Sequence, residues 1–191
     1  GACRGLRRAG IPHAIHLFQW SNRAGSLFVL PDLMRQCRLN RKAKRLAKFI
    51  EQLVKDHPGV PIHLIGYSTG VYVACEAIKV LPPDVRVGRM IALHGTVSSD
   101  YELTEVLART DSVINVYSRG DWIINGLGPL LFGTNDRVHA VACGMVGFRR
   151  PREGLVDRPW SWNDIRKGYF GDHFTVMSSV WIRDQIAPLL R

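Results

Sequence analysis

The sequence predicts an α/β fold in which a mostly parallel sheet carries helices on both faces. Short apolar, β-branched segments alternate with segments whose apolar residues recur at helical spacing. Gly and Pro residues separate most of these segments. Strands that alternate with helices are typical of a parallel sheet. The 191 residues contain no internal repeat, so we expect a single domain over residues 1–191.

The chain opens with the end of a helix and then a strand. Residues 3–10 close on Gly10, which is typical of a helix C-terminus. Residues 13–20, HAIHLFQW, follow Pro12 and precede a turn-forming Ser-Asn pair, so they predict a strand.

The next three elements are a helix, a strand and a helix. Residues 40–57 place apolar side chains at i, i+3, i+4 and i+7, and Pro58 follows them. Residues 60–66 form a short apolar run that predicts a buried strand. Residues 69–81 predict a helix that stops before two prolines.

The middle of the chain predicts strands on either side of a short helix. Residues 88–95 predict a buried strand and residues 112–118 an alternating, β-branched one. Between them, residues 100–109 predict a short helix that Asp100 could cap. Residues 137–142 are a weaker strand candidate.

The last part of the chain combines a long excursion with a final helix. Residues 122–170 are rich in Gly and apolar residues, and we expect them to shape a pocket or act as a lid. Residues 174–190 predict the final helix despite their β-branched start.

Ser68 lies between Gly66 and Gly70, after a predicted strand and before a predicted helix. The spacing G-x-S-x-G in this context is typical of a sharp turn that presents a nucleophilic serine. Side chains two residues either side of the serine would collide, which explains both glycines. The backbone N–H of Thr69, at the start of the helix, would donate to an oxyanion.

A nucleophilic serine needs a base, and the base needs an acid that orients it. Asp121 follows a predicted strand at its carboxyl end and is the expected acid. Asp100 and Asp136 remain alternatives, whereas Asp111 begins a strand and lies at the wrong edge of the sheet.

His173 is the expected base, since it precedes the last predicted helix in a loop that Gly171 allows to turn sharply. His94 is the alternative, at the carboxyl end of its strand but before Asp121 in the chain. We expect His94 to line the pocket instead, together with Tyr67 and Trp122, which adjoin the predicted nucleophile and acid.

With these residues in this order, the chain resembles the α/β-hydrolase family, in the branch of lipase- and esterase-like serine hydrolases. The motifs GYSTG, SRGD and GDH carry the resemblance, in this order along the chain. The resemblance implies cleavage of a carboxylic ester: Ser68 attacks the carbonyl carbon, His173 takes the proton and Asp121 holds His173 in the useful tautomer. An acyl-enzyme forms, and water then hydrolyses it.

The resemblance also implies that the loop with the second oxyanion donor lies either at Gly1 and Ala2 or outside this chain, and we expect that it lies outside, in a missing N-terminal part. In the family a strand and an oxyanion loop precede the helix with which this chain begins, and that strand lies centrally in the sheet. We therefore expect a gap of about one strand between residues 13–20 and residues 60–66, ~9–10 Å wide. In a rival alignment, residues 13–20 are that strand and WSNRAG, residues 20–25, is the oxyanion loop.

The formal net charge is +10, and the positive charge is concentrated in residues 35–48 and 148–152. Neither segment interleaves aromatic residues for base stacking, so we expect a solvated basic face and no nucleic acid partner. The expected partner is a small-molecule or lipid ester, and contact with a membrane surface is compatible with the charge. The four scattered cysteines have no zinc-ligand spacing, and we expect no metal or cofactor.

Two other functions fit the same sequence. A thioesterase or an acyltransferase would use the same three residues. A hydrolase-fold binding protein without activity would instead show steep salt-dependent affinity for DNA or anionic vesicles.

Overall fold

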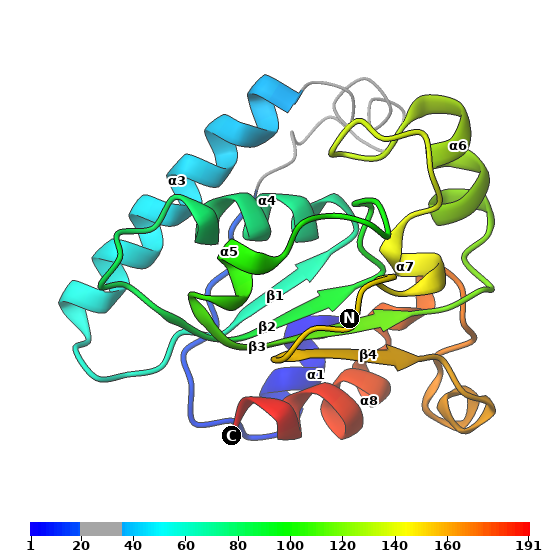
Figure 1. Ribbon diagram of the computed structural model, residues 1–191. Helices are drawn as coiled ribbons and strands as arrows, with labels where there is room; N and C mark the ends of the chain where they lie inside the picture. The colour runs from blue at the N-terminus through cyan, green and yellow to red at the C-terminus, as the bar shows by residue number, and fades with distance from the viewer. Residues whose placement is uncertain (20–35) are drawn as a thin grey trace.

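A computed structural model describes residues 1–19 and 36–191 as an α/β structure around one parallel sheet (Figure 1). The described strands are β1 (Leu64–Tyr67), β2 (Val87–Leu93), β3 (Thr110–Tyr117) and β4 (Leu155–Pro159). They lie in the order β1-β2-β3-β4, and every neighbouring pair is parallel. Consecutive parallel strands need crossover segments, which explains the alternation in the sequence.

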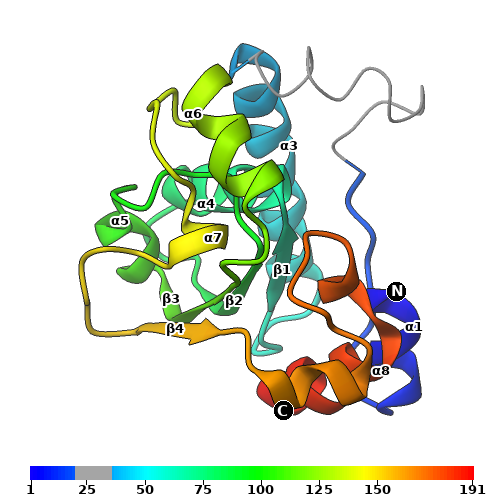
Figure 2. The ribbon, with the colours of Figure 1, turned by 90° about the vertical axis from the view of Figure 1, so that its right-hand side faces the viewer.

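Helices lie on both faces of this sheet (Figures 1 and 2). The described α-helices are α1 (Ala2–Arg8), α3 (Gln36–Asp56), α4 (Thr69–Lys79), α5 (Thr104–Leu107), α6 (Gly128–Phe132), α7 (Cys143–Val146) and α8 (Ser179–Trp181). The π and 3₁₀ turns are η2 (Ile123–Leu127), η3 (Trp162–Lys167), η4 (Thr175–Met177), η5 (Ile182–Ile186) and η6 (Ala187–Leu190). The predicted α/β class with a parallel sheet is therefore confirmed.

Successive residues of β2 point into two different cores. Met90 and Ala92 join the cluster under α3, α4 and α5, whereas Ile91 and Leu93 join the cluster against α1 and the C-terminal turns. All four side chains are fully buried. A parallel sheet that is covered on both faces reads as a continuous apolar run, which is how this strand appears in the sequence.

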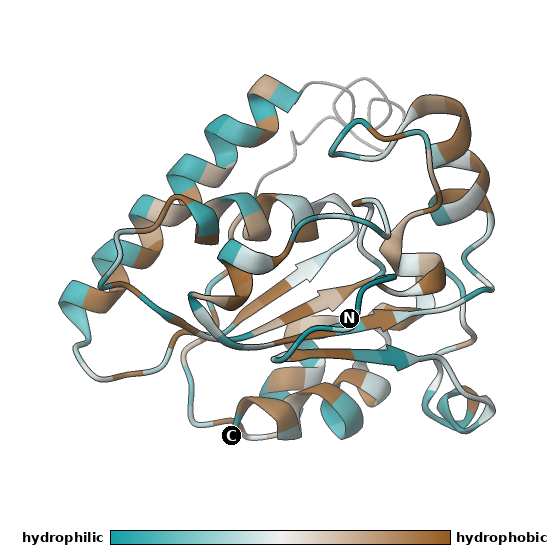
Figure 3. Cartoon of the chain, viewed as in Figure 1, coloured by the Kyte–Doolittle hydropathy of each residue, from teal (hydrophilic) through white to brown (hydrophobic). Residues whose placement is uncertain are grey.

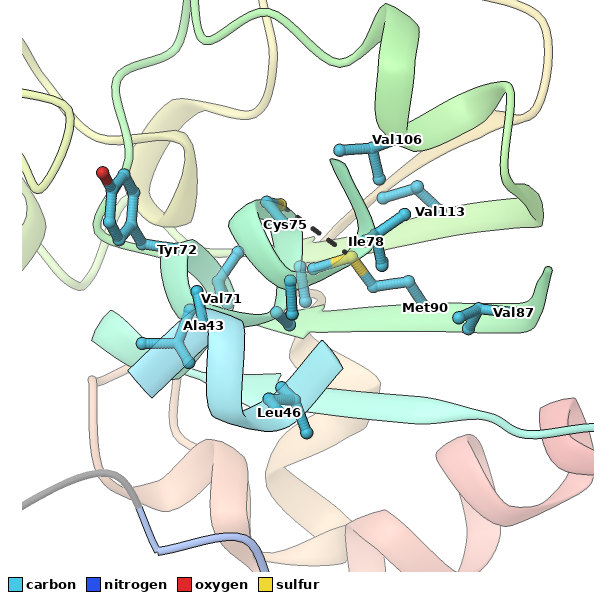
Figure 4. Close-up of a cluster of buried hydrophobic side chains, with 14 of the residues drawn as sticks. Ala43, Leu46, Val71, Tyr72, Cys75, Ile78, Val87, Met90, Val106 and Val113 are labelled. Atoms are coloured by element: carbon cyan, nitrogen blue, oxygen red, sulfur yellow. Dashed lines mark hydrogen bonds between the residues drawn. The ribbon is translucent and has the colours of Figure 1, made fainter. Parts of the chain in front are cut away.

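The larger core lies between α3, α4 and the sheet (Figure 4). Ala43 and Leu46 of α3 pack beside Val71 of α4, and Cys75 reaches the sulfur of Met90 at 3.9 Å. This cluster encloses the helix that follows Ser68, so the position of that helix is fixed by tight packing.

Helix α3 is amphipathic. Its buried residues recur at helical spacing (Leu39, Ala43, Leu46, Ala47, Ile50). Hydrophilic residues cover its outer face (Figure 3). The basic residues Arg41, Lys44, Arg45 and Lys48 are exposed there, as expected for a solvated face.

Four element predictions need correction. The described residues 13–19 form no strand and lie at the surface without regular secondary structure. They bury Ile15 and Phe18 partly against the two cores, and His13 Nε2 lies 2.7 Å from the carbonyl oxygen of Leu190. Alternating burial along a surface segment therefore imitates the pattern of a strand.

The fourth strand lies elsewhere than predicted. Residues 137–142 make only an isolated bridge between Ala142 and Ser98, whereas β4 arises from residues 155–159, inside the predicted lid segment. Residues 122–170 therefore supply part of the sheet as well as η2, α6 and α7.

Two predicted helices are shorter or broken. Of residues 100–109, only Thr104–Leu107 is α-helical, and Asp100 pairs with Arg149 on the surface rather than capping the helix. Residues 174–190 form a succession of 3₁₀, α and π turns, because the β-branched residues and Pro188 interrupt a regular helix.

Candidate active site

Ser68 occupies the turn between β1 and α4. Its backbone angles, φ 54° and ψ −127°, lie in a region that residues other than glycine rarely adopt. Gly66 allows this turn, because a Cβ there would lie 2.9 Å from Val71 Cα and 3.0 Å from the Gly70 oxygen. The turn presents Ser68 beyond the carboxyl end of a parallel strand, where sites of such sheets form.

His173 and Asp121 lie in line with Ser68. Nε2 of His173 is 3.0 Å from Oγ of Ser68, and its Nδ1 is 2.7 Å from Oδ2 of Asp121. The carboxylate only accepts hydrogen bonds, so Nδ1 of His173 carries the proton and Nε2 can accept the hydroxyl hydrogen. The three side chains have the geometry of a nucleophile, a base and an orienting acid.

Two glycines let the loops of the acid and the base touch. A Cβ on Gly120 would lie 2.8 Å from the oxygen of Gly171, and a Cβ on Gly171 would lie 2.9 Å from Oγ of Ser118. Gly171 also has φ +85°, which strains other residues. Backbone contact between these loops sets Asp121 within reach of His173.

Asp121 is 2% exposed and receives three hydrogen bonds on one oxygen. Burial alone would raise its pKa, but the hydrogen bonds from His173 and His94 outweigh burial and hold the pKa below its usual value. Nδ2 of Asn125 donates to the same oxygen at 2.6 Å. The carboxylate therefore remains ionised at neutral pH and can stabilise a positive charge on His173.

His94 is fully buried and does not lie among the cavity-lining residues, contrary to the expectation for this side chain. Its Nδ1 is 2.6 Å from Oδ2 of Asp121, and its Nε2 is 2.5 Å from the hydroxyl of Tyr169. With both ring nitrogens engaged in this way, His94 does not act as the base for Ser68. Tyr169 and Asn125 complete the network, and no sequence motif points to either residue.

Tyr67 lies beside the base. Its hydroxyl donates to the carbonyl oxygen of His173 at 3.1 Å, and the two rings are 5.2 Å apart. Burial, with the charges of Asp121 and Asp172, raises the pKa of Tyr67 to about 12, so the phenol keeps its proton. Trp122 lies outside the cavity lining and is 57% exposed.

The alternative acids make other contacts. Asp100 pairs with Arg149 at 3.0 Å, and Asp136 accepts hydrogen bonds from the backbone and the hydroxyl of Ser98. Asp172 accepts bonds from the backbone N–H groups two and three residues further on, so it holds the turn after His173.

Thr69 is the first residue of α4, and its N–H therefore has no acceptor inside the helix. It follows the nucleophile directly, which is where the turn would supply an oxyanion donor. The alternative oxyanion loop, residues 20–25, lies outside the described residues.

A large apolar cavity opens beside Ser68. Its volume is about 1560 Å³, and residues of β1, of α3 and of the segment 123–133 line it together with residues 11–18. Tyr67, Ser68 and His173 all lie on its wall. The cavity runs along β1, and the described residues 13–19 do not pair with that strand.

His94, Asp121 and His173 also offer three potential metal-ligand atoms within 4.8 Å of one another. The ring nitrogens already lie 2.6 and 2.7 Å from the carboxylate oxygen, which are distances of direct hydrogen bonds. Zinc binds such ligands at about 2.0–2.2 Å and needs a lone pair on each nitrogen. An ion would therefore have to displace both protons and draw His173 away from Ser68, so these residues do not fit a metal site.

Among the residues that the structure describes, no helix combines the length and the apolar character that crossing a bilayer needs. Comparisons with protein-family models, with curated proteins and with solved structures found no match.

Proposed function

We propose that the chain is a serine hydrolase of the α/β-hydrolase fold that cleaves a carboxylic ester through an acyl-enzyme. The observation that carries the proposal is the alignment of Ser68, His173 and Asp121, with contacts of 3.0 and 2.7 Å. The strained backbone at Ser68 supports it, because strain of this kind gathers at functional sites.

The reaction has two steps. Ser68 Oγ attacks the ester carbonyl carbon while His173 Nε2 takes its proton, and the N–H of Thr69 donates to the oxygen that becomes negative. His173 returns the proton to the leaving alkoxide as the C–O bond breaks. A water molecule then attacks the acyl-enzyme, with His173 first accepting and then returning a proton, and the acid leaves from Ser68.

The cavity wall favours an apolar acyl group. On one side it presents Leu46 and Phe49 of α3, and on the other Ile124 and Leu127 of η2. An acyl chain in this space would leave water for apolar surface, which contributes about 0.8 kcal/mol for each buried CH₂.

Labelling tests the proposal directly. A fluorophosphonate should form one covalent adduct with the folded protein, and peptide mass spectrometry should locate the adduct on Ser68, because among the described residues this is the hydroxyl that lies within hydrogen-bond distance of His173 Nε2. Protein denatured before the probe is added should remain unlabelled. An adduct elsewhere, or equal labelling of the denatured chain, would contradict the proposal.

Acyl chain length should affect turnover through the cavity. We expect kcat/KM for p-nitrophenyl esters to rise by about tenfold or more from acetate to octanoate, since each further methylene is buried. Leu127→Gln should reduce this preference by placing an amide on the cavity wall. Leu130→Gln is the matched control, because Leu130 is as exposed as Leu127 (50% each) but does not line the cavity. An equal effect of both variants would exclude this cavity as the acyl site.

A further inference from the structure

We propose that His94 is a positioning residue that holds the acid of the triad in place by donating to the same oxygen of Asp121 as His173 does. The inference rests on the proposed function. The two Nδ1 atoms lie 2.6 and 2.7 Å from this oxygen. One carboxylate is thus held between two imidazoles, of which only His173 also reaches Ser68.

The proton positions in this network follow from the chemistry of its members. Burial lowers the pKa of His94, and this effect outweighs the attraction of Asp121, so the ring is neutral and carries one proton. A carboxylate only accepts, so this proton is on Nδ1. Nε2 then accepts a hydrogen bond from Tyr169, whose pKa burial raises. A single chain of donors results, from Tyr169 through His94 to Asp121.

The backbone of His94 has an unusual conformation, and hydrogen bonds hold it there. Its φ is 49°, in the left-handed region that few non-glycine residues adopt. Its N–H donates to the oxygen of Val116 at 3.0 Å, and Asn125 Nδ2 donates to its oxygen at 3.2 Å. Asn125 therefore binds both the backbone of His94 and the carboxylate of Asp121, so that His94 is locked relative to the acid.

Without the hydrogen bond from His94, the carboxylate of Asp121 should rotate more freely. Its negative charge would also be shared with one donor fewer, so it should attract the proton of His173 more strongly. The titratable and charged groups that act on His94 are Asp121, His173 and Asp172, together with the hydroxyl of Tyr169. Losing a neutral donor from this set strengthens the hold of the carboxylate on the His173 proton. The base then needs a higher pH to become free, and its alignment with Ser68 is less well maintained.

The test compares His94→Phe with His94→Asn. Phenylalanine keeps a ring but removes the donor, so we expect kcat to fall by about tenfold or more and the acidic limb of the pH–rate profile to move up by about half a unit. KM should change less than about twofold, since His94 does not line the cavity. Asparagine tolerates positive φ and places an amide donor where Nδ1 lies, so it should restore most of kcat and the original limb.

Tyr169→Phe adds a second arm with a matched control. It removes the O–H that fixes Nε2 of His94, and we expect a smaller shift of the acidic limb in the same direction. Tyr72→Phe also removes a tyrosine hydroxyl that hydrogen-bonds a neighbour, Asn40, but it lies in the other core and should leave the limb unchanged.

The outcomes separate the inference from the proposed function. An active wild type, with a folded His94→Phe variant that matches it in kcat and pH profile, overturns the positioning role alone. The same holds if His94→Asn is impaired as much as His94→Phe, or if Tyr72→Phe shifts the limb as Tyr169→Phe does. A wild type that hydrolyses no ester and takes up no fluorophosphonate overturns the proposed function, and the role of His94 with it.

Discussion

Replacing Ser68 with alanine is expected to lower the kcat for a p-nitrophenyl ester by about 10⁶-fold. The reason is that Ser68 provides the oxygen that lies 3.0 Å from His173 Nε2, and without this oxygen the proposed acyl-enzyme cannot form. Stopped-flow release of p-nitrophenol measures the effect: the wild type should show a burst of about one equivalent before the steady state, and the variant should show none.

Ser112→Ala is the matched control for this variant. Ser112 is a half-buried residue near the amino end of β3, whereas the site lies at the carboxyl ends of the strands. The control should keep the burst and the turnover of the wild type. A Ser68→Ala variant that retains a burst would show that another residue is acylated, and the assignment of the nucleophile would be wrong.

Asp121→Asn is expected to lower kcat by about 10³- to 10⁴-fold. The amide removes the negative charge that stabilises a protonated His173, and its neutral oxygen is a weaker acceptor for the three donors that converge on Oδ2 of Asp121. Steady-state kinetics against Asp100→Asn measures the effect, because Asp100 is the surface alternative paired with Arg149. A larger loss in Asp100→Asn would reverse the assignment of the acid.

The same variant should also change how stability depends on pH. The pKa of Asp121 is lower in the folded state than its ordinary value, so the ionised carboxylate contributes stability above that ordinary value, about 3.8. This contribution disappears as the pH falls through the folded-state pKa. The Tm of the wild type should therefore exceed that of Asp121→Asn at pH 7, and the difference should shrink below about pH 4.

Much of the site could be predicted from the sequence because its residues occupy the ends of regular elements. The turn at Ser68 follows from glycine spacing between a strand and a helix, and these local constraints leave few other conformations. Asp121 was predicted from its place after β3, although its contact with His173 depends on two glycines that meet only in the folded chain.

The network behind the acid could not be predicted in this way. His94 lies at the carboxyl end of β2, so its position was correct, but its side chain points into the protein because φ is 49°. The spacing of apolar residues along a sequence does not predict a positive φ at a residue other than glycine. Tyr169 looks like any aromatic core residue, and only the folded structure shows that its hydroxyl meets Nε2 of His94.

The misread elements share one physical cause. Local patterns report which side chains are buried, but not what buries them. Apolar and polar side chains alternate in residues 13–19 because Ile15 packs against one core and Phe18 against the other. Strand β4, by contrast, contains Asp157, Arg158 and Pro159 and looks polar in sequence. Asp157 pairs with Asn115 in the register of β3 and β4, and its carboxylate accepts a hydrogen bond from Asn115 Nδ2 at 2.7 Å. Such partners come from distant parts of the chain, which a sequence window does not include.

The three proposed triad residues come from far apart in the chain. The nucleophile and the base are separated by 105 residues, and the acid and the base by 52. Closing loops of this length costs entropy before any contact between their ends can offset it, so such contacts form late in folding. The turn at Ser68 depends on residues only a few positions away in the chain, so it can form early in folding. Recovery of hydrolysis during refolding would thus mark the docking of the C-terminal segment on a sheet that has already assembled.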